Sequence, residues 1–318
     1  MRLLPPEITE IVLGNYWLIL ACLLGYAAAF VLISYAAKRQ LADEVSDYVV
    51  ASRNLGWLVV TFTMYASVLS GVGMAGIPGT AYTVGVPFVV TVLMGHTIAL
   101  ALLWYFGPRI WILGKEYRYT TPGDLLGDYY QSDLVRVYTV IASILFNIAY
   151  IVAQLLAGGV MLNVLSGNMI SFEMGVLIIT VIVMVHVASS GLRGIAWLDL
   201  FNGLFILLLL VVFGLMILMT TGGPSSLLEG LGPLKESFIT TPGTVGVFTP
   251  AHIFGIFIGL SIGTIVLSPS AWIRIYSARS QTYFAKISVL MLVLWFFTHI
   301  FGTYLIGSYG RLVMPDVE

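Results

Sequence analysis

Glycine and serine residues interrupt the apolar segment at 57–79 in a pattern that could bind a cation. The segment reads WLVVTFTMYASVLSGVGMAGIPG, in which Ser67 and Ser70 precede three glycines, Pro78 and Gly79. Close packing against neighbouring helices is one interpretation, because small residues let helix backbones approach. An unwound stretch within a membrane is the other, since its free backbone carbonyls need a partner and a cation is a suitable one.

A second apolar segment, at 251–273, is broken in a similar way. Glycine occurs at every fourth position, and the triplet Ser268-Pro269-Ser270 then interrupts the run. Two glycine- and proline-broken segments in corresponding positions are typical of transporters built from inverted repeats, which bind solute and ions at the breaks. The pair therefore predicts such a transporter and favours unwinding over simple packing.

Asp199 is the most informative charged residue, because it lies inside the start of the apolar segment 196–221, in the string GLRGIAWLDLFNG. Most other acidic residues lie in loops or at segment ends. A carboxylate within a membrane helix marks a functional site by default. Two interpretations stay open: Asp199 pairs with Arg193, six residues earlier, or it helps a cation leave near the cytoplasmic face.

A polar stripe follows one face of the helix predicted at 136–165. Asn147, Tyr150, Gln154 and Gly158 are spaced at i, i+3, i+7 and i+11, which places them on the same side of a helix. Hydrogen bonding between helices and the lining of a cavity explain this stripe equally well.

Other motifs indicate less about function. His96, His186 and His299 lie in separate apolar segments, and each is expected to be a hydrogen-bonded interior residue rather than a ligand. The residues at 71–76 match GxGxxG, but a dinucleotide site needs a preceding strand and a soluble βαβ unit. The single cysteine, Cys22, excludes an internal disulfide and a cysteine-based metal site.

The composition indicates the class of protein that must position these residues. Hydrophobic residues make up 59% of the 318 residues and charged residues 9%, with a mean hydropathy of +1.00. An average soluble domain has about 25% charged residues, so an ordinary cytoplasmic enzyme and a disordered chain are excluded. The net charge of −1 also provides no basic surface for nucleic acid.

Long apolar segments predict an all-α, multi-pass membrane protein. A membrane helix needs about 20 mostly apolar residues. Eight segments meet this requirement: 15–37, 57–79, 84–107, 136–165, 172–190, 196–221, 251–273 and 284–309.

Lys and Arg predict the orientation of these segments in the cell membrane, because they concentrate in cytoplasmic loops. Of 14 basic residues, 11 lie in loops on one side and 3 on the other. The larger group is Lys38, Arg39, Arg53, Arg109, Lys115, Arg118, Arg136, Arg193, Arg274, Arg279 and Lys286. We therefore expect the N-terminus outside, and the loops near 38–56, 108–135, 191–195 and 274–283 in the cytoplasm.

Four strings together make the chain resemble the sodium:solute symporter family. They are YASVLSGVGMAGIPG at 65–79, YTTPGDLLGDYYQS at 119–132, GLRGIAWLDLFNG at 191–203 and WIRIYSARS at 272–280. Their order and spacing agree with the family along nearly the whole chain. The string TPGDLLGD makes the chain look similar to bacterial monocarboxylate and pantothenate permeases.

The resemblance implies an inverted five-helix-repeat fold and cotransport of a small organic solute with sodium, without another cofactor. In this family backbone carbonyls of the first broken helix hold sodium, and the matching positions are Ala66 and Leu69. The family's acidic residue in the W-x-D string matches Asp199, which would help sodium leave inward. Hard cations prefer oxygen ligands, which carbonyls and hydroxyls supply. The candidate solute contacts are Ser67, Ser70, Ser268 and Ser270, with Asn147 and Gln154 if the polar stripe lines the cavity.

The resemblance also divides the chain. It assigns 1–56 to an extra helix and a cytoplasmic loop, 57–221 to a first repeat, 222–250 to an outer loop and 251–318 to the first two helices of a second repeat. This second repeat is expected to be truncated, because three of its five helices and the hydroxyl ligands on the next core helix have no counterpart. Where some bacterial members carry an acid between the two carbonyl-donating positions, this chain has Val68.

Two other classes remain as alternatives. A proton-coupled transporter or channel of related fold would favour a relay of buried carboxylates and histidines. Only Asp199 and scattered histidines are available for that relay, so sodium is preferred. A membrane-embedded enzyme would need a nucleophile with a base, or metal ligands, facing each other, and no such pair stands out by spacing. The expected partners are sodium, a small organic solute and the lipid bilayer, and not nucleic acid.

Overall fold

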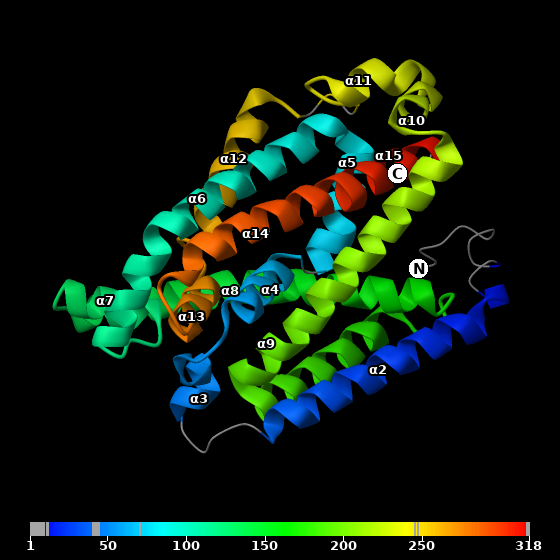
Figure 1. The fold of residues 1–318 in the computed structure, drawn as a ribbon. Helices are drawn as coiled ribbons and strands as arrows, with labels where there is room; N and C mark the ends of the chain where they lie inside the picture. Colours follow the sequence, from blue (N-terminus) through cyan, green and yellow to red (C-terminus); the bar gives the residue numbers. More distant parts are fainter. Residues whose placement is uncertain are drawn as a thin grey trace. The chain divides into compact units, whose positions relative to one another are not determined.

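The computed structural model describes residues 10, 13–39, 45–69, 71–244, 246 and 248–315. These residues form helices joined by turns, with one isolated parallel bridge between Leu55 and Ala278 and no longer strand among them (Figure 1). The prediction of an all-helical protein is therefore confirmed for the described part of the chain.

Five helices in the described chain are long and apolar enough to cross a membrane. They are Tyr16–Ala36, Val86–Glu116, Asp133–Leu165, Ser190–Thr221 and Tyr283–Val313. A bent pair of helices counts as a sixth if it forms one span, and Phe172–Ala188 and Pro250–Gly263 are shorter apolar helices. A multi-pass membrane protein is confirmed, whereas the eight spans and their inverted repeat stay predictions.

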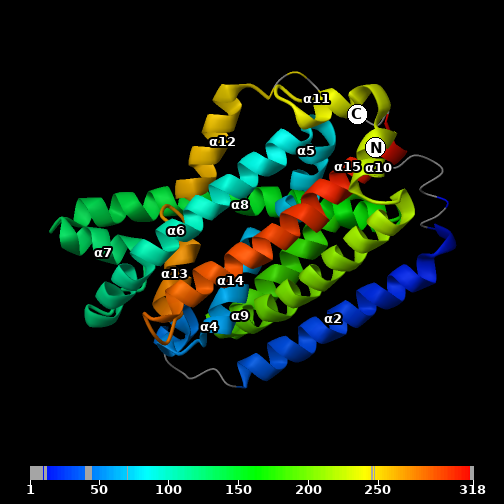
Figure 2. The same ribbon diagram turned by 45° about the horizontal axis from the view of Figure 1, so that its top comes forward.

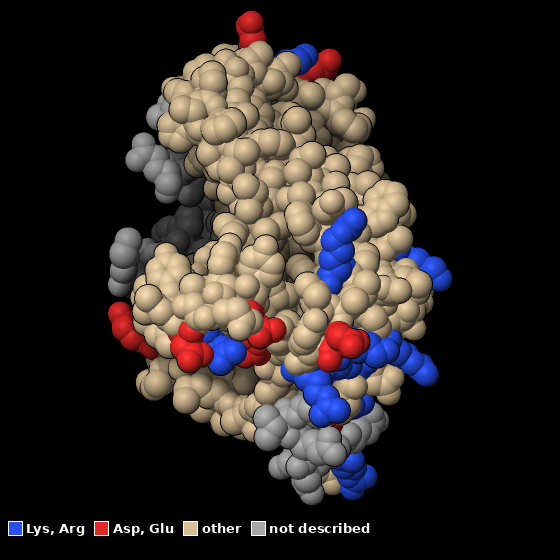
Figure 3. Space-filling view, turned by 90° about the vertical axis from the view of Figure 1, so that its left-hand side faces the viewer, with Lys and Arg blue, Asp and Glu red and all other residues tan. Residues whose placement is uncertain are grey.

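Charged side chains are sparse on the face that Figure 3 shows, which consists mostly of uncharged residues. Many large hydrophobic side chains are exposed to the surroundings, for example Leu134, Trp17 and Met219. Exposed apolar surface of this extent is stable against lipid and not against water.

The contacts within the chain define two compact units. The first contains residues 1–52 and 140–198, and the second contains 53–139 and 199–318. The first unit consists of α2 (Tyr16–Lys38), α3 (Val45–Val50), most of α8 (Asp133–Leu165) and the beginning of α9 (Phe172–Thr221).

Small residues bring α8 and α9 together inside the first unit. A Cβ atom on Gly175 would lie 3.0 Å from the Gly159 carbonyl oxygen, and one on Gly158 would lie 3.2 Å from Ile179. Helices pack this closely only where at least one partner lacks a side chain. Gly158 is the last member of the predicted polar stripe, so at least this part of the stripe serves helix packing.

α9 breaks at a single residue, Gly191, which has φ 56° and ψ −165°. A Cβ atom there would lie 2.9 to 3.2 Å from atoms of Tyr48 on α3. The Tyr48 hydroxyl donates to the Val187 carbonyl at 3.0 Å, which satisfies an acceptor at the break. The prediction of a loop at 191–195 is therefore wrong, since the helix resumes directly after Gly191.

The second unit is built around α6 (Val86–Glu116), which packs against both α12 (Pro250–Gly263) and α14 (Tyr283–Phe297) (Figures 1 and 2). Glycines on α6 allow this close packing: Gly95 faces Leu260 and Gly107 faces the Phe284 ring. The later part of α9 belongs to this unit. Its other elements are α4 (Trp57–Val68), η2 (Val72–Gly76), α5 (Ile77–Val84), α7 (Pro122–Tyr129), α10 (Pro224–Gly230), η3 (Gly232–Leu234), α11 (Lys235–Ile239), α12 (Pro250–Gly263), α13 (Pro269–Ser277), α14 (Tyr283–Phe297), η4 (Thr298–Tyr304) and α15 (Leu305–Val313).

The string TTPGD within 119–132 is the start of α7. Thr121 is the N-cap: its hydroxyl accepts from the Asp124 N–H at 3.2 Å, and the Asp124 carboxylate accepts from the Thr121 N–H at 2.8 Å. This reciprocal capping box satisfies two backbone donors that a helix start leaves free. Burial alone would raise the pKa of Asp124, but hydrogen bonds from the N–H groups of Thr120 and Thr121 outweigh it and hold that pKa below its usual range.

Gly85 joins α5 to α6 in a backbone conformation open only to glycine. Its φ is 99° with ψ −161°, and an added Cβ would lie 2.2 Å from the Phe238 carbonyl oxygen. We expect Gly85→Ala to lower the free energy of unfolding by about 1–3 kcal/mol, measured as a lower thermal midpoint in detergent. Gly79→Ala is the control, because nothing lies within 4 Å of a Cβ there. An equal loss in both variants would contradict this account of Gly85.

Candidate functional site

The first broken segment forms two helices bent by 63°, α4 and the helix that begins at Gly73. The backbone leaves the helix at Leu69, which has φ −79° and ψ 60°, and a π-helix, η2, follows at Val72–Gly76. The last carbonyls of any helix lack partners within it and carry its negative dipole end. Ala66 lies in this last turn of α4 and Leu69 directly after it, whereas Ser70 lies outside the described residues.

The second broken segment is interrupted where the sequence predicted it. α12 ends at Gly263, and α13 begins at Pro269 with Ser268 as its N-cap residue. The Ser268 and Ser270 hydroxyls lie 2.9 Å apart, and the Trp272 indole N–H donates to the Val266 carbonyl in the break at 2.9 Å. Proline at the first helical position starts α13 without losing a hydrogen bond.

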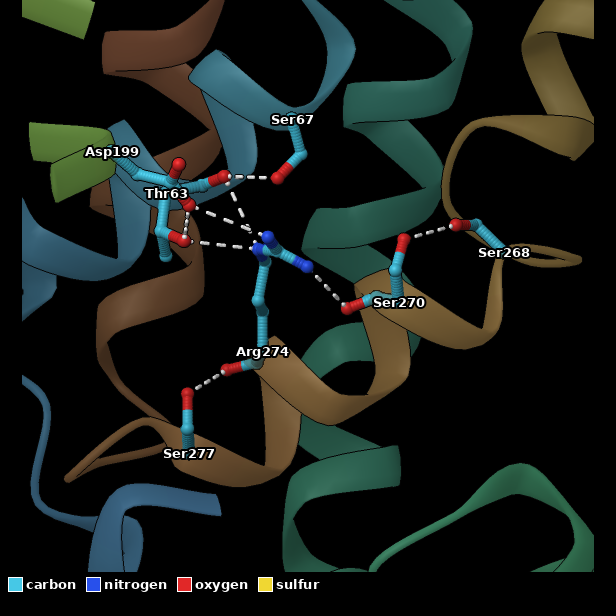
Figure 4. Close-up of polar contacts among 7 residues, drawn as sticks. All are labelled: Thr63, Ser67, Asp199, Ser268, Ser270, Arg274 and Ser277. Atoms are coloured by element: carbon cyan, nitrogen blue, oxygen red, sulfur yellow. Dashed lines mark hydrogen bonds and ion pairs between the residues drawn. The ribbon is translucent and has the colours of Figure 1, made fainter. Parts of the chain in front are cut away.

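Three elements of the second unit meet at Asp199 (Figure 4). Its Oδ2 accepts from the Thr63 hydroxyl at 2.5 Å and from Arg274 Nη2 at 3.4 Å. Thr63 lies on α4, Asp199 on α9 and Arg274 on α13, so the cluster connects both broken segments to the acid. The Ser67 hydroxyl donates to the Thr63 carbonyl at 2.7 Å and is part of the same network.

Asp199 and Arg274 are largely buried, with side-chain exposures of 17% and 11%. The pairing of Asp199 with Arg193 considered from the sequence is not the one present. Arg193 instead donates to Asp47 in the first unit at 2.5 Å, where Asp47 is fully buried and also accepts from the Ser52 hydroxyl.

Sequence reasoning missed two members of this cluster, Thr63 and Arg274. Arg274 was counted as a cytoplasmic loop charge, but it is 9% exposed within α13. The signals were available: Thr63 precedes Ser67 by one helical turn, and Arg274 follows Ser270 by one turn, so each pair shares a helix face.

The polar stripe residues Asn147 and Gln154 lie on α8 in the first unit, whereas the three described serine candidates, Ser67, Ser268 and Ser270, belong to the second. Asn147 Nδ2 donates to the Ser143 carbonyl one turn earlier at 2.8 Å. The cluster around Asp199 therefore brings together Ser67, Asp199 and, through Arg274 and the Ser270 carbonyl, the start of α13.

The interior histidines are hydrogen-bonded, as the sequence predicted. His96 Nδ1 lies 3.3 Å from His299 Nε2, and His299 Nδ1 lies 2.6 Å from the Trp295 carbonyl. His186 Nδ1 lies 2.9 Å from the Ser34 hydroxyl within the first unit. Two of the histidines thus form a buried pair that their spacing of 203 residues did not reveal.

A model of the sodium:solute symporter family matches residues 48–317. The chain is 27% identical over 283 residues to the sodium/pantothenate symporter of Escherichia coli (strain K12), covering 88% of this chain and 57% of that protein. It is 26% identical over 198 residues to a high-affinity proline transporter of Bacillus subtilis (strain 168), covering 60% of this chain and 41% of that protein.

The fold is similar to a solved Na⁺-coupled sialic acid symporter in a substrate-bound outward-open state. The TM-score is 0.73 at 20% sequence identity, over 92% of this chain and 61% of that one. The fold is that of a multi-pass membrane protein with broken helical segments. The chain belongs to the sodium:solute symporter family, and it spans just over half the length of the sodium/pantothenate symporter that it matches. The family and these relatives are transporters and not enzymes.

Proposed function

We propose that the protein couples the movement of a small organic solute to sodium, and that the solute is a monocarboxylate or a pantothenate-like acid. The observation that carries this proposal is the meeting of a broken apolar helix, a buried carboxylate and a second broken segment in a member of this family. The pantothenate relative supports the choice of an acid, since it aligns over most of the chain.

The proposed sodium ligands are the backbone carbonyls of Ala66 and Leu69 at the end of α4. A helix C-terminus favours a cation both through its dipole and through its unpaired carbonyls, and oxygen is the ligand that hard cations prefer. Asp199 is the proposed acceptor of the ion on its way inward. Thr63 links Asp199 to the end of α4. Its hydroxyl donates to Asp199, and its carbonyl accepts from the Ser67 hydroxyl one turn later.

The proposed solute contacts are hydroxyls near the two breaks. The Ser268 and Ser270 hydroxyls bond to each other, and a solute oxygen could replace one partner of that bond. The remaining proposed contacts near the breaks are Ser67 and Ser70, whereas Asn147 and Gln154 stay candidates from the sequence alone.

The proposed topology places the N-terminus outside the cell membrane. The division into a leading helix (1–56), a first repeat (57–221), an outer loop (222–250) and the start of a second, inverted repeat (251–318) belongs to the same proposal. The 11 to 3 distribution of Lys and Arg supports it. Arg193 and Arg274 count less in this distribution, because both are engaged in buried ion pairs.

Proton coupling is the second candidate, and one observation favours it. His96 and His299 form a buried pair at 3.3 Å, and such histidines occur in proton relays of transporters. Sodium remains the better supported ion, because the buried acid bonds to Thr63 on the broken helix, whereas the two histidines bond to each other.

The proposed solute class predicts a pattern of uptake by cells that express the gene encoding this chain. We expect radiolabelled pantothenate or a short monocarboxylate to enter faster than in cells with an empty vector, and only when sodium is present outside. Unlabelled solute of the same class should compete, and proline should not. Sodium-dependent uptake of proline with no uptake of either acid would contradict the proposed solute class while leaving sodium coupling intact.

A further inference from the structure

The Arg274 guanidinium binds four acceptors, of which only one is charged. Nε donates to the carbonyl and hydroxyl oxygens of Thr63 at 3.2 and 3.0 Å, and Nη1 donates to the Ser270 carbonyl at 3.1 Å. Nη2 reaches Oδ2 of Asp199 at 3.4 Å, the longest of the four contacts (Figure 4). Arg274 can therefore release Asp199 and keep three neutral partners.

The ion pair of Arg274 and Asp199 has no net charge in the absence of sodium. A guanidinium stays protonated in proteins, so with an ionised Asp199 the two charges sum to zero. Both side chains are largely buried, at 11% and 17% exposure. A sodium ion at the same carboxylate would add an unbalanced positive charge, and repulsion from Arg274 is several-fold stronger there than in water.

Thr63 connects this pair to the broken helix. Its hydroxyl donates to Asp199 Oδ2 and accepts from Arg274 Nε, so it contacts both charges. Its carbonyl accepts from Arg274 Nε and from the Ser67 hydroxyl, one turn before α4 ends at Val68. Thr63 therefore holds the guanidinium beside the helix end that carries the proposed sodium ligands when the contact with Asp199 is released.

We propose that Arg274 is a built-in competitor of sodium: it occupies Asp199 when the ion is absent and must release Asp199 before sodium is held there. The inference rests on the proposed role of Asp199 in sodium passage. Arg274 is a positioning residue in this scheme, because it acts on the ion through Asp199. Its effect is to weaken sodium binding at the acid, which helps the ion leave.

The test is equilibrium binding of radioactive sodium to the purified chain in lipid nanodiscs. Arg274→Gln removes the charge but keeps a side chain that can bond to Thr63, so the half-saturating sodium concentration should fall tenfold or more. If Arg274 had only a structural role, the variant would be less stable and its half-saturating sodium concentration would be unchanged. The decrease should disappear in the double variant Arg274→Gln/Asp199→Asn, because Arg274 acts through Asp199.

Arg53→Gln is the matched control, because Arg53 belongs to the same unit and donates to the Tyr276 and Tyr119 carbonyls. It should leave the sodium concentration unchanged. An unchanged or raised half-saturating sodium concentration in a folded Arg274→Gln protein overturns the inference. The proposed function still stands in that case if the wild type binds sodium. Absence of saturable binding in the wild type contradicts sodium coupling itself and overturns both.

A second measurement applies if Arg274→Gln does not fold. Phenylglyoxal modifies free guanidinium groups, and peptide mass spectrometry reports the fraction modified at Arg274 in the unaltered protein. Sodium should raise that fraction, and potassium at the same concentration should not. Equal modification with the two ions would overturn the inference.

Discussion

Asp199→Asn is expected to raise the half-saturating sodium concentration tenfold or more while the protein remains folded. Asparagine has nearly the same shape, and its amide oxygen can still accept from Thr63 and Arg274. Arg274 also keeps its contacts with Thr63 and the Ser270 carbonyl, so its charge is not left without acceptors. What is lost is the negative charge, and each tenfold rise corresponds to roughly 1.4 kcal/mol of lost interaction with the ion.

Radioactive sodium binding to the purified variant measures this effect, with thermal unfolding as the check on folding. The opposite signs expected for Asp199→Asn and Arg274→Gln separate an electrostatic role from general damage, since damage moves both variants in the same direction. A folded Asp199→Asn protein with an unaltered sodium response would remove Asp199 from the mechanism.

Asp47→Asn is expected to cause the largest loss of stability among these changes. Asp47 is fully buried in the first unit and binds Arg193 Nη2 at 2.5 Å. Removing one partner of a buried pair leaves the other charge uncompensated and costs about 3–5 kcal/mol. The loss should appear as a lower thermal midpoint and as less folded protein per cell, with the half-saturating sodium concentration unchanged in the protein that folds.

Asp133→Asn is the control for this prediction. Asp133 also pairs with an arginine, Arg136 at 3.5 Å, but the two side chains are 95% and 48% exposed. Exposed pairs contribute little because water screens them, so the thermal midpoint should not change. A midpoint of Asp47→Asn equal to that of the wild type would show that Asp47 and Arg193 do not depend on each other.

The helix breaks and the acid could be predicted because their signals are local. Glycine and proline within an apolar run disfavour continuous helix wherever the chain folds. The second interruption lies at the expected Ser268-Pro269, whereas the first begins at Leu69, just before the glycines, and Pro78 and Gly79 lie within α5. Asp199 stood out because its apolar neighbours on either side require burial. The start of α7 was also local, since Thr121, Pro122 and Asp124 form a capping box within four residues.

The partners of the buried charges could not be predicted, because they come from distant parts of the chain. Asp199 and Arg274 are 75 residues apart, and Asp47 and Arg193 are 146 apart. Nearness in the sequence made Arg193 a candidate partner for Asp199, but the break at Gly191 and the docking of α3 beside it bring Asp47 to Arg193 instead. Which charges meet depends on which helices pack beside each other, and a single sequence carries no direct signal for that arrangement.

Solute accumulation in proteoliposomes that hold the product of the gene encoding this chain is the most direct test of sodium coupling. An inward sodium gradient and an inward proton gradient are imposed separately, with the same lipid and the same external solute. The account predicts accumulation above the external concentration with the sodium gradient and none with the proton gradient. Accumulation that is equally fast without sodium and driven by the proton gradient would contradict it and favour the pair His96 and His299 as the coupling groups.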